Sequence, residues 1–103
     1  MNAKVEMVRH LEGKPKIKCA QIRYGSDWDE ESQVVFNLKI GYSEQDFLKW
    51  LDSLSFNYDS GYGGQELHGM VWFEDGSWLE RGEYDGSEWW EYKTTPTIPE
   101  SLY

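Results

Sequence analysis

The sequence predicts an α+β domain in which an antiparallel sheet of about five strands carries one amphipathic helix on one face. Three observations lead to this fold class. The chain of 103 residues is long enough for one domain with a modest core. Residues 43–54 repeat their apolar side chains with helical spacing. Two Asp-Gly-Ser turns, ten residues apart, separate short alternating segments, which is typical of an antiparallel meander.

Two alternating segments predict the first strands of the sheet. Residues 16–24 alternate well enough for a strand, but neither of their faces is cleanly apolar, which we expect near a sheet edge. Residues 34–40 place four aliphatic or aromatic side chains on one face and are therefore the clearest strand in the first half. Residues 25–32, which lie between them, are rich in turn formers and charge, and this composition predicts a hairpin loop.

The predicted helix spans residues 43–54. Ser43 is suited to cap its N-terminus, and Asp46 follows three residues later, as in a capping box. The apolar side chains then recur at positions i, i+3, i+4 and i+7, namely Phe47, Trp50, Leu51 and Leu54. Because no second segment shows a helix of comparable length, we expect this helix to pack against the sheet.

The second half of the chain predicts a three-stranded meander. Its strands are residues 65–73, 78–83 and 88–93. The turns at Asp75-Gly76 and Asp85-Gly86 connect them, because Asp-Gly suits the positive-φ corner of a tight hairpin.

We expect a single domain over residues 1–103, of which residues 94–103 form an extended C-terminal tail. Pro96 and Pro99 predict that this tail is free of helix. The longest uninterrupted apolar run, residues 70–73, is far too short to cross a membrane.

The charge of the chain is strongly asymmetric. Residues 1–24 contain six basic and two acidic residues, whereas residues 25–103 contain four basic and seventeen acidic ones. The net charge of -9 argues against binding to nucleic acid phosphates or to anionic membranes. Two interpretations remain open: the acidic side chains only keep the domain soluble, or they attract a cationic protein partner.

Residue types for catalysis or metal binding are scarce, so we predict no enzyme, no metal and no cofactor. The chain contains one cysteine, Cys19, and two histidines, His10 and His68, and it has none of the spacings of a zinc site. The acidic residues 27–31 lack the pattern of a calcium loop. A single cysteine and the absence of a secretory apolar core in residues 1–10 suit a reducing cytoplasm.

Aromatic side chains are concentrated in the meander. Strand alternation sends Trp89 and Trp90 to opposite faces, so one of them must lie outside a one-sided core. Exposed aromatic rings beside carboxylates suit a basic protein surface. The alternative is that cross-strand aromatic pairs only stabilise a small sheet.

The meander also carries a resemblance to known proteins. Its tract from Gly76 to Tyr92 reads GSWLERGEYDGSEWWEY and is followed by Pro96 and Pro99. Over roughly residues 61–100 the chain resembles small uncharacterised acidic proteins of tailed bacteriophages. The resemblance implies a phage or prophage origin and the host cytoplasm, and it transfers no catalytic residue. Phage proteins of this size and charge often resemble inhibitors of host defence, including anti-CRISPR proteins and mimics of DNA, although the basic residues 1–24 depart from a uniformly acidic mimic.

These observations lead to a predicted function. We expect a non-enzymatic phage protein that binds and inhibits a host protein with a basic, nucleic-acid-binding surface. The alternative is a small-ligand binder that sequesters a signalling nucleotide with the loop of residues 61–64 and a tryptophan. The oligomeric state is left open. The residues expected to contact the host protein are Tyr62, Trp78, Glu80, Glu83, Tyr84, Asp85, Glu88, Trp90 and Glu91.

Overall fold

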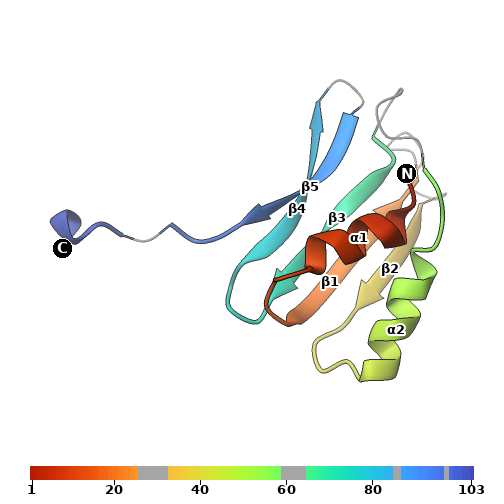
Figure 1. The fold of residues 1–103 in the computed structure, drawn as a ribbon, viewed down its shortest axis with the longest axis horizontal. Helices are drawn as coiled ribbons and strands as arrows, with labels where there is room; N and C mark the ends of the chain where they lie inside the picture. The colour runs from red at the N-terminus through yellow and green to blue at the C-terminus, as the bar shows by residue number, and fades with distance from the viewer. Residues whose placement is uncertain (26–32, 59–64, 85–86, 97) are drawn as a thin grey trace.

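The computed structural model describes residues 1–25, 33–58, 65–84, 87–96 and 98–103 and confirms the predicted α+β class (Figure 1). A five-stranded antiparallel sheet carries two helices. The helices are α1 (Ala3–Leu11) and α2 (Glu44–Ser53), and the strands are β1 (Ile17–Tyr24), β2 (Val34–Leu38), β3 (Leu67–Phe73), β4 (Trp78–Tyr84) and β5 (Ser87–Lys93).

The strand order is β2-β1-β3-β4-β5, so β2 and β5 form the edges of the sheet. The segment expected near an edge, residues 16–24, lies next to the edge strand β2 but is not itself an edge, because β1 pairs with β2 on one side and with β3 on the other. The mixed pattern of β1 has a different cause. A register shift between Ile17 and Cys19 brings Ile17 onto the same buried face as Ala20 and Ile22.

Helix α2 forms as the sequence predicts. The side chain of Ser43 accepts a hydrogen bond from the backbone N–H of Asp46, and the Asp46 carboxylate accepts one from the backbone N–H of Ser43. Hydrogen bonds from the backbone N–H and the side chain of Ser43 to the Asp46 carboxylate lower the pKa of Asp46. Trp50 and Leu54 are buried against the sheet, while Phe47 and Leu51 pack at the margin of the core.

Helix α1 was not predicted, and the expectation of a single helix on the sheet is wrong. Its buried residues are Ala3, Glu6 and Met7, so a carboxylate interrupts its apolar stripe, while Val5 and Val8 are exposed. The pattern therefore does not indicate an amphipathic helix.

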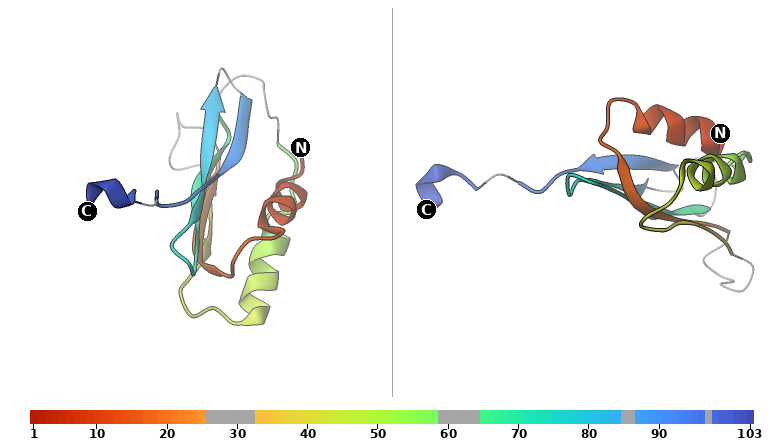
Figure 2. Two further views of the ribbon diagram at one scale, coloured as in Figure 1. Left: turned by 60° about the vertical axis from the view of Figure 1, so that its left-hand side comes forward. Right: turned by 90° about the horizontal axis from the view of Figure 1, so that it is seen from below.

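The backbone before α1 is attached to the chain that follows α2. Ala3 N–H donates to the carbonyl of Phe56 at 2.9 Å, and Tyr58 N–H donates to the carbonyl of Met1, also at 2.9 Å. Both helices lie on the same face of the sheet (Figure 2).

The core lies between the helices and this face of the sheet. Its largest fully buried side chains are Phe73, Met7, Ile22, Leu54, Leu67, Leu79 and Val71. No described element covers the opposite face of the sheet (Figure 2). We call these the covered face and the open face.

The turn between β3 and β4 forms at the predicted position. Gly76 has a φ of 89°, in the left-handed region that favours glycine, and its N–H donates to the carbonyl of Phe73. The predicted turn at Asp85-Gly86 lies outside the described residues.

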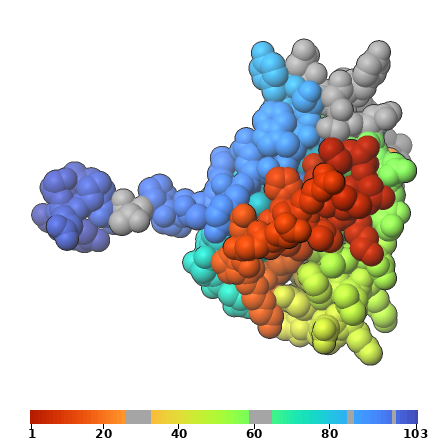
Figure 3. Space-filling model, in the orientation of Figure 1, coloured from red at the N-terminus to blue at the C-terminus, as the bar shows by residue number. Residues whose placement is uncertain are grey.

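Beyond β5 the chain extends away from the body of the molecule (Figures 1 and 3). The described residues of the tail are exposed. One turn of 3₁₀ helix, Glu100–Leu102, follows Pro99, so the tail is not entirely free of helix.

Candidate protein-interaction face

The strands of the meander present two chemically similar faces. Val71 of β3 lies opposite Leu79 of β4, and both are buried under the helices. The next pair, Trp72 and Trp78, therefore points to the open face. On β5, Trp90 is 3% exposed and Trp89 is 37% exposed, which confirms that these two side chains lie on opposite faces.

The covered face contains a buried group of charged side chains around Arg81. Its Nε donates to Glu88 at 3.2 Å, and its Nη2 donates to the same carboxylate at 2.7 Å. Its Nη1 lies 3.3 Å from both carboxylate oxygens of Glu6 on α1. Nη2 also donates to the hydroxyl of Tyr58 at 2.6 Å, and that hydroxyl donates to Glu6. The arginine side chain is 2% exposed, so this network is sealed from solvent.

Two aromatic rings complete this arrangement. The guanidinium carbon of Arg81 lies 5.0 Å from the Trp90 ring centre and 5.3 Å from that of Tyr58, within cation–π range. Glu88 also accepts hydrogen bonds from the backbone N–H groups of Glu66 and Leu67. We call Glu6, Tyr58, Arg81, Glu88 and Trp90 the Arg81 cluster.

The electrostatics of the Arg81 cluster favour one arrangement of protons. Burial alone would lower the pKa of Arg81, but the hydrogen bonds to Glu88 and the charge of Glu6 raise it above its ordinary value. Burial, and then the hydrogen bond to Glu6, raise the pKa of the Tyr58 hydroxyl. Arg81 therefore stays charged and Tyr58 stays protonated, so each keeps its hydrogen bonds.

The burial of this cluster corrects part of the predicted site. Glu88 is 4% exposed and Trp90 is 3% exposed, so neither side chain reaches the surface. The sequence pattern predicts both on the contact surface because they belong to the acidic and aromatic meander. On the covered face both contact Arg81, which in turn binds Glu6 of α1.

The open face of the meander carries three tryptophans. Trp72 and Trp78 are cross-strand partners on β3 and β4. Trp89 lies opposite Gly82, where an added Cβ would come within 2.7 Å of the Trp89 Nε1 atom, so the indole occupies the space over the glycine. Trp72 and Trp89 are each 37% exposed. Together with Glu80 and Glu91, these three tryptophans form what we call the tryptophan face.

The two carboxylates of the tryptophan face are held in place by their neighbours. The indole N–H of Trp78 donates to Glu80 at 3.2 Å, and that of Trp89 donates to Glu91 at 2.9 Å. Lys93 Nζ lies 3.0 Å from Glu80 and 3.7 Å from Glu91. The hydrogen bonds from Lys93 and Trp78 lower the pKa of Glu80. Glu80 therefore stays charged at neutral pH.

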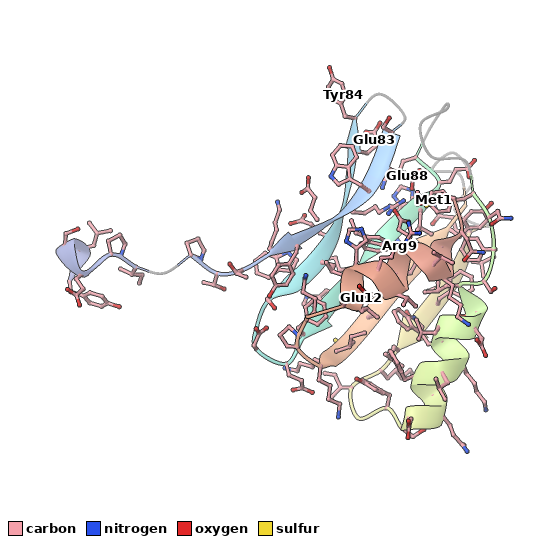
Figure 4. All side chains as sticks on the ribbon, in the orientation of Figure 1. Met1, Arg9, Glu12, Glu83, Tyr84 and Glu88 are labelled. Carbon is pink, nitrogen blue, oxygen red and sulfur yellow. The ribbon has the colours of Figure 1, made fainter. Side chains whose placement is uncertain are left out.

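The remaining predicted residues are dispersed. Tyr84 is 77% exposed and stands at the far end of β4, beside the exposed Glu83 (Figure 4). Tyr62 and Asp85 lie outside the described residues, as does the loop of residues 61–64 on which the nucleotide-binding alternative depends. The structure thus brings together Trp78, Glu80 and Glu91 from the predicted set.

The sequence interpretation missed Trp72 and Trp89. The pattern itself contained the necessary signal, because Val71 and Leu79 are the most apolar positions of their strands and mark the covered face. Because side chains alternate along a strand, their neighbours Trp72, Trp78 and Glu80 lie on the open face. Only the pairing of β4 with β5 adds Trp89 and Glu91.

The reactive side chains are too far apart for a catalytic pair. Cys19 lies opposite Trp72, whereas His68 lies opposite Arg23, four positions along β3. At about 3.3 Å per residue, this separates Cys19 from His68 by roughly 13 Å. Among the described residues, no three His, Cys, Asp or Glu side chains are grouped so that they could hold a metal ion.

The described helices are also too short and too polar for any of them to span a bilayer. Hollows lie on both faces of the sheet. One of about 390 Å³ lies on the helix side, beside Leu11, Tyr42 and Phe47. Another, of about 330 Å³, adjoins the tryptophan face at Trp72 and is also lined by Cys19 and Ile40.

Comparison with known proteins gives no relative: no protein-family model, no curated protein and no solved structure matches the chain. The function must therefore be argued from the arrangement of its own side chains.

Proposed function

We propose that this chain is a non-enzymatic binding protein that attaches to a cationic surface of another protein through its tryptophan face. The observation that carries the proposal is the coexistence of two tryptophans, each 37% exposed, with two ordered carboxylates on a sheet face that no described element covers. Aromatic side chains are enriched where protein interfaces gain most of their binding energy. Carboxylates next to them select a basic partner.

The partner in this proposal is a host protein whose basic surface binds nucleic acid, and the chain is a phage protein that inhibits it. The net charge of -9 supports this choice, because a strongly acidic protein accelerates its encounter with a cationic surface and is repelled by nucleic acid. Inhibition follows from occupancy, since nucleic acid and the chain compete for the same basic surface.

The proposal is tested with a panel of purified host nucleic-acid-binding proteins, among them RNA-guided nucleases. Binding of the chain is measured by interferometry at rising salt and with competing double-stranded DNA. We expect binding to weaken as the Debye length falls from about 10 Å at 0.1 M to about 3 Å at 1 M salt, and DNA to compete.

Matched variants identify the contact face. Trp72→Ser with Trp89→Ser removes the two most exposed indoles of the described residues, whereas Val5→Ser with Leu48→Ser removes exposed apolar side chains from the helices. We expect the first variant to lose binding at least tenfold and the second to bind like the parent, with both still folded by circular dichroism. Equal binding by the two variants would refute the assignment of the tryptophan face.

A further inference from the structure

Two carboxylates of the tryptophan face oppose each other directly. Glu80 of β4 and Glu91 of β5 are cross-strand partners. Like charges in this position destabilise a sheet, so the pair requires a cation nearby. The chain supplies one from the end of β5, where the ammonium of Lys93 reaches both carboxylates.

The carboxylates are more firmly positioned than the cation. Each receives an indole N–H from its own strand, Glu80 from Trp78 and Glu91 from Trp89. The side chain of Lys93 is 47% exposed, and its distances to the two carboxylates are unequal, at 3.0 and 3.7 Å. Exposed ion pairs of this kind contribute little, because water and salt compete with them. Another cation can therefore replace Lys93 at small cost.

We infer that Glu80, Glu91, Trp78 and Trp89 form a binding site for an arginine side chain of the protein partner, and that Lys93 occupies this site until the partner binds. This inference rests on the proposed function and names the partner group that the tryptophan face recognises. Lys93 then competes with the arginine of the partner for the carboxylates of Glu80 and Glu91.

The chemistry of the site favours arginine over lysine. A guanidinium carries five donors in a planar fork, so it can bond two carboxylates at once, whereas one ammonium reaches the second at only 3.7 Å here. Guanidinium groups also stack on aromatic rings, and two indoles flank the carboxylates. The negative charge of the whole chain complements an arginine-bearing segment.

The test uses the full chain and a defined probe, a blocked hexapeptide of alternating glycine and arginine, with its glycine–lysine counterpart. Binding is followed by NMR through the indole N–H signals of Trp78 and Trp89. We expect the arginine peptide to move both signals and to bind more tightly than the lysine peptide.

Two pairs of charge-matched variants isolate the site. Lys93→Met should tighten binding of the arginine peptide about threefold to tenfold relative to Lys39→Met, which changes the net charge equally at an exposed residue between β2 and α2. Glu80→Gln with Glu91→Gln should weaken binding at least tenfold relative to Glu12→Gln with Glu100→Gln, whose carboxylates are exposed elsewhere.

The inference is overturned if the two lysine variants bind alike, if the two glutamate pairs bind alike, or if the indole signals do not move. It is also overturned if Lys93→Met forms dimers in light scattering, because a second copy would then be the occupant. Failure of this inference can be distinguished from failure of the proposed function. If a protein partner no longer binds the variant Trp72→Ser with Trp89→Ser but still binds the variant Glu80→Gln with Glu91→Gln, the tryptophan face remains the proposed interface and only the arginine site is refuted.

Discussion

The two faces of the β4–β5 hairpin use the same residue types for different purposes. On the covered face, Arg81, Glu88 and Trp90 form a sealed network in which the arginine is 2% exposed. On the open face, Glu80, Glu91 and Lys93 form ion pairs whose side chains are 35–47% exposed. The comparison teaches that residue type does not distinguish a structural cluster from a candidate interface in this protein. What distinguishes them is the cover that the rest of the chain provides.

The largest effect on stability is expected from the removal of Arg81. Arg81→Met leaves Glu6 and Glu88 buried without their cation, and we expect the free energy of unfolding to fall by about 3–5 kcal/mol. Denaturation by urea measures the loss. The exposed Arg23 on β1 provides the control, since Arg23→Met should change stability by less than about 0.5 kcal/mol. Equal stability of the two variants would show that the Arg81 cluster does not hold the fold together.

A smaller loss is expected when only the hydroxyl of Tyr58 is removed. Tyr58→Phe takes away the group that accepts from Arg81 and donates to Glu6, and this should cost about 1–3 kcal/mol in urea denaturation.

The pH dependence of stability gives a further test of Tyr58→Phe. The raised pKa of Tyr58 means that the unfolded chain releases this proton first, near the ordinary value of 10.0. The stabilisation is therefore complete below about pH 10 and is lost as the pH rises further. Between about pH 9 and about pH 11, the parent should lose more stability than Tyr58→Phe. Parallel pH profiles would contradict the buried role of this hydroxyl.

On the open face, the position of Trp89 can be changed without touching the core. Gly82→Ala places a Cβ where the indole lies, so Trp89 must move, while stability should change by no more than about 1 kcal/mol. We expect altered tryptophan fluorescence and weaker partner binding. In a Trp89→Ser background the same substitution should have no further effect on binding, and a further loss there would place the contact elsewhere.

The smallest effect on folding is expected from the open-face carboxylates. Glu80→Gln with Glu91→Gln removes a like-charge pair and its ion pairs to Lys93, all partly exposed. The melting temperature should stay within about 2 °C of the parent in calorimetry. A large drop would mean that the open face, like the covered face, is structural.

Much of the fold could be predicted from local patterns. The capping box of Ser43 and Asp46 placed the start of α2 within one residue, and the apolar repeat that ends at Leu54 placed its end within one residue, because both signals are local to the helix. The alternation around Asp75-Gly76 placed β3 and β4 for the same reason. Helix α1 could not be predicted, since its stability depends on Glu6 reaching Arg81, which is 75 residues away in the chain.

The sequence alone determined the strands of the meander, the helix α2 and the fact that Trp89 and Trp90 point in opposite directions. Each follows from the geometry of a short segment. Only the tertiary structure decided which of the two tryptophans is buried. The pattern of β5 alone does not say which side the helices cover, because this strand carries Trp and Glu on both faces. Glu6 of α1 and the hydroxyl of Tyr58 supply partners for Arg81 on one side only. Because a buried arginine is stable only where such partners surround it, that side became the core, and the indoles and carboxylates of the other side were left at the surface.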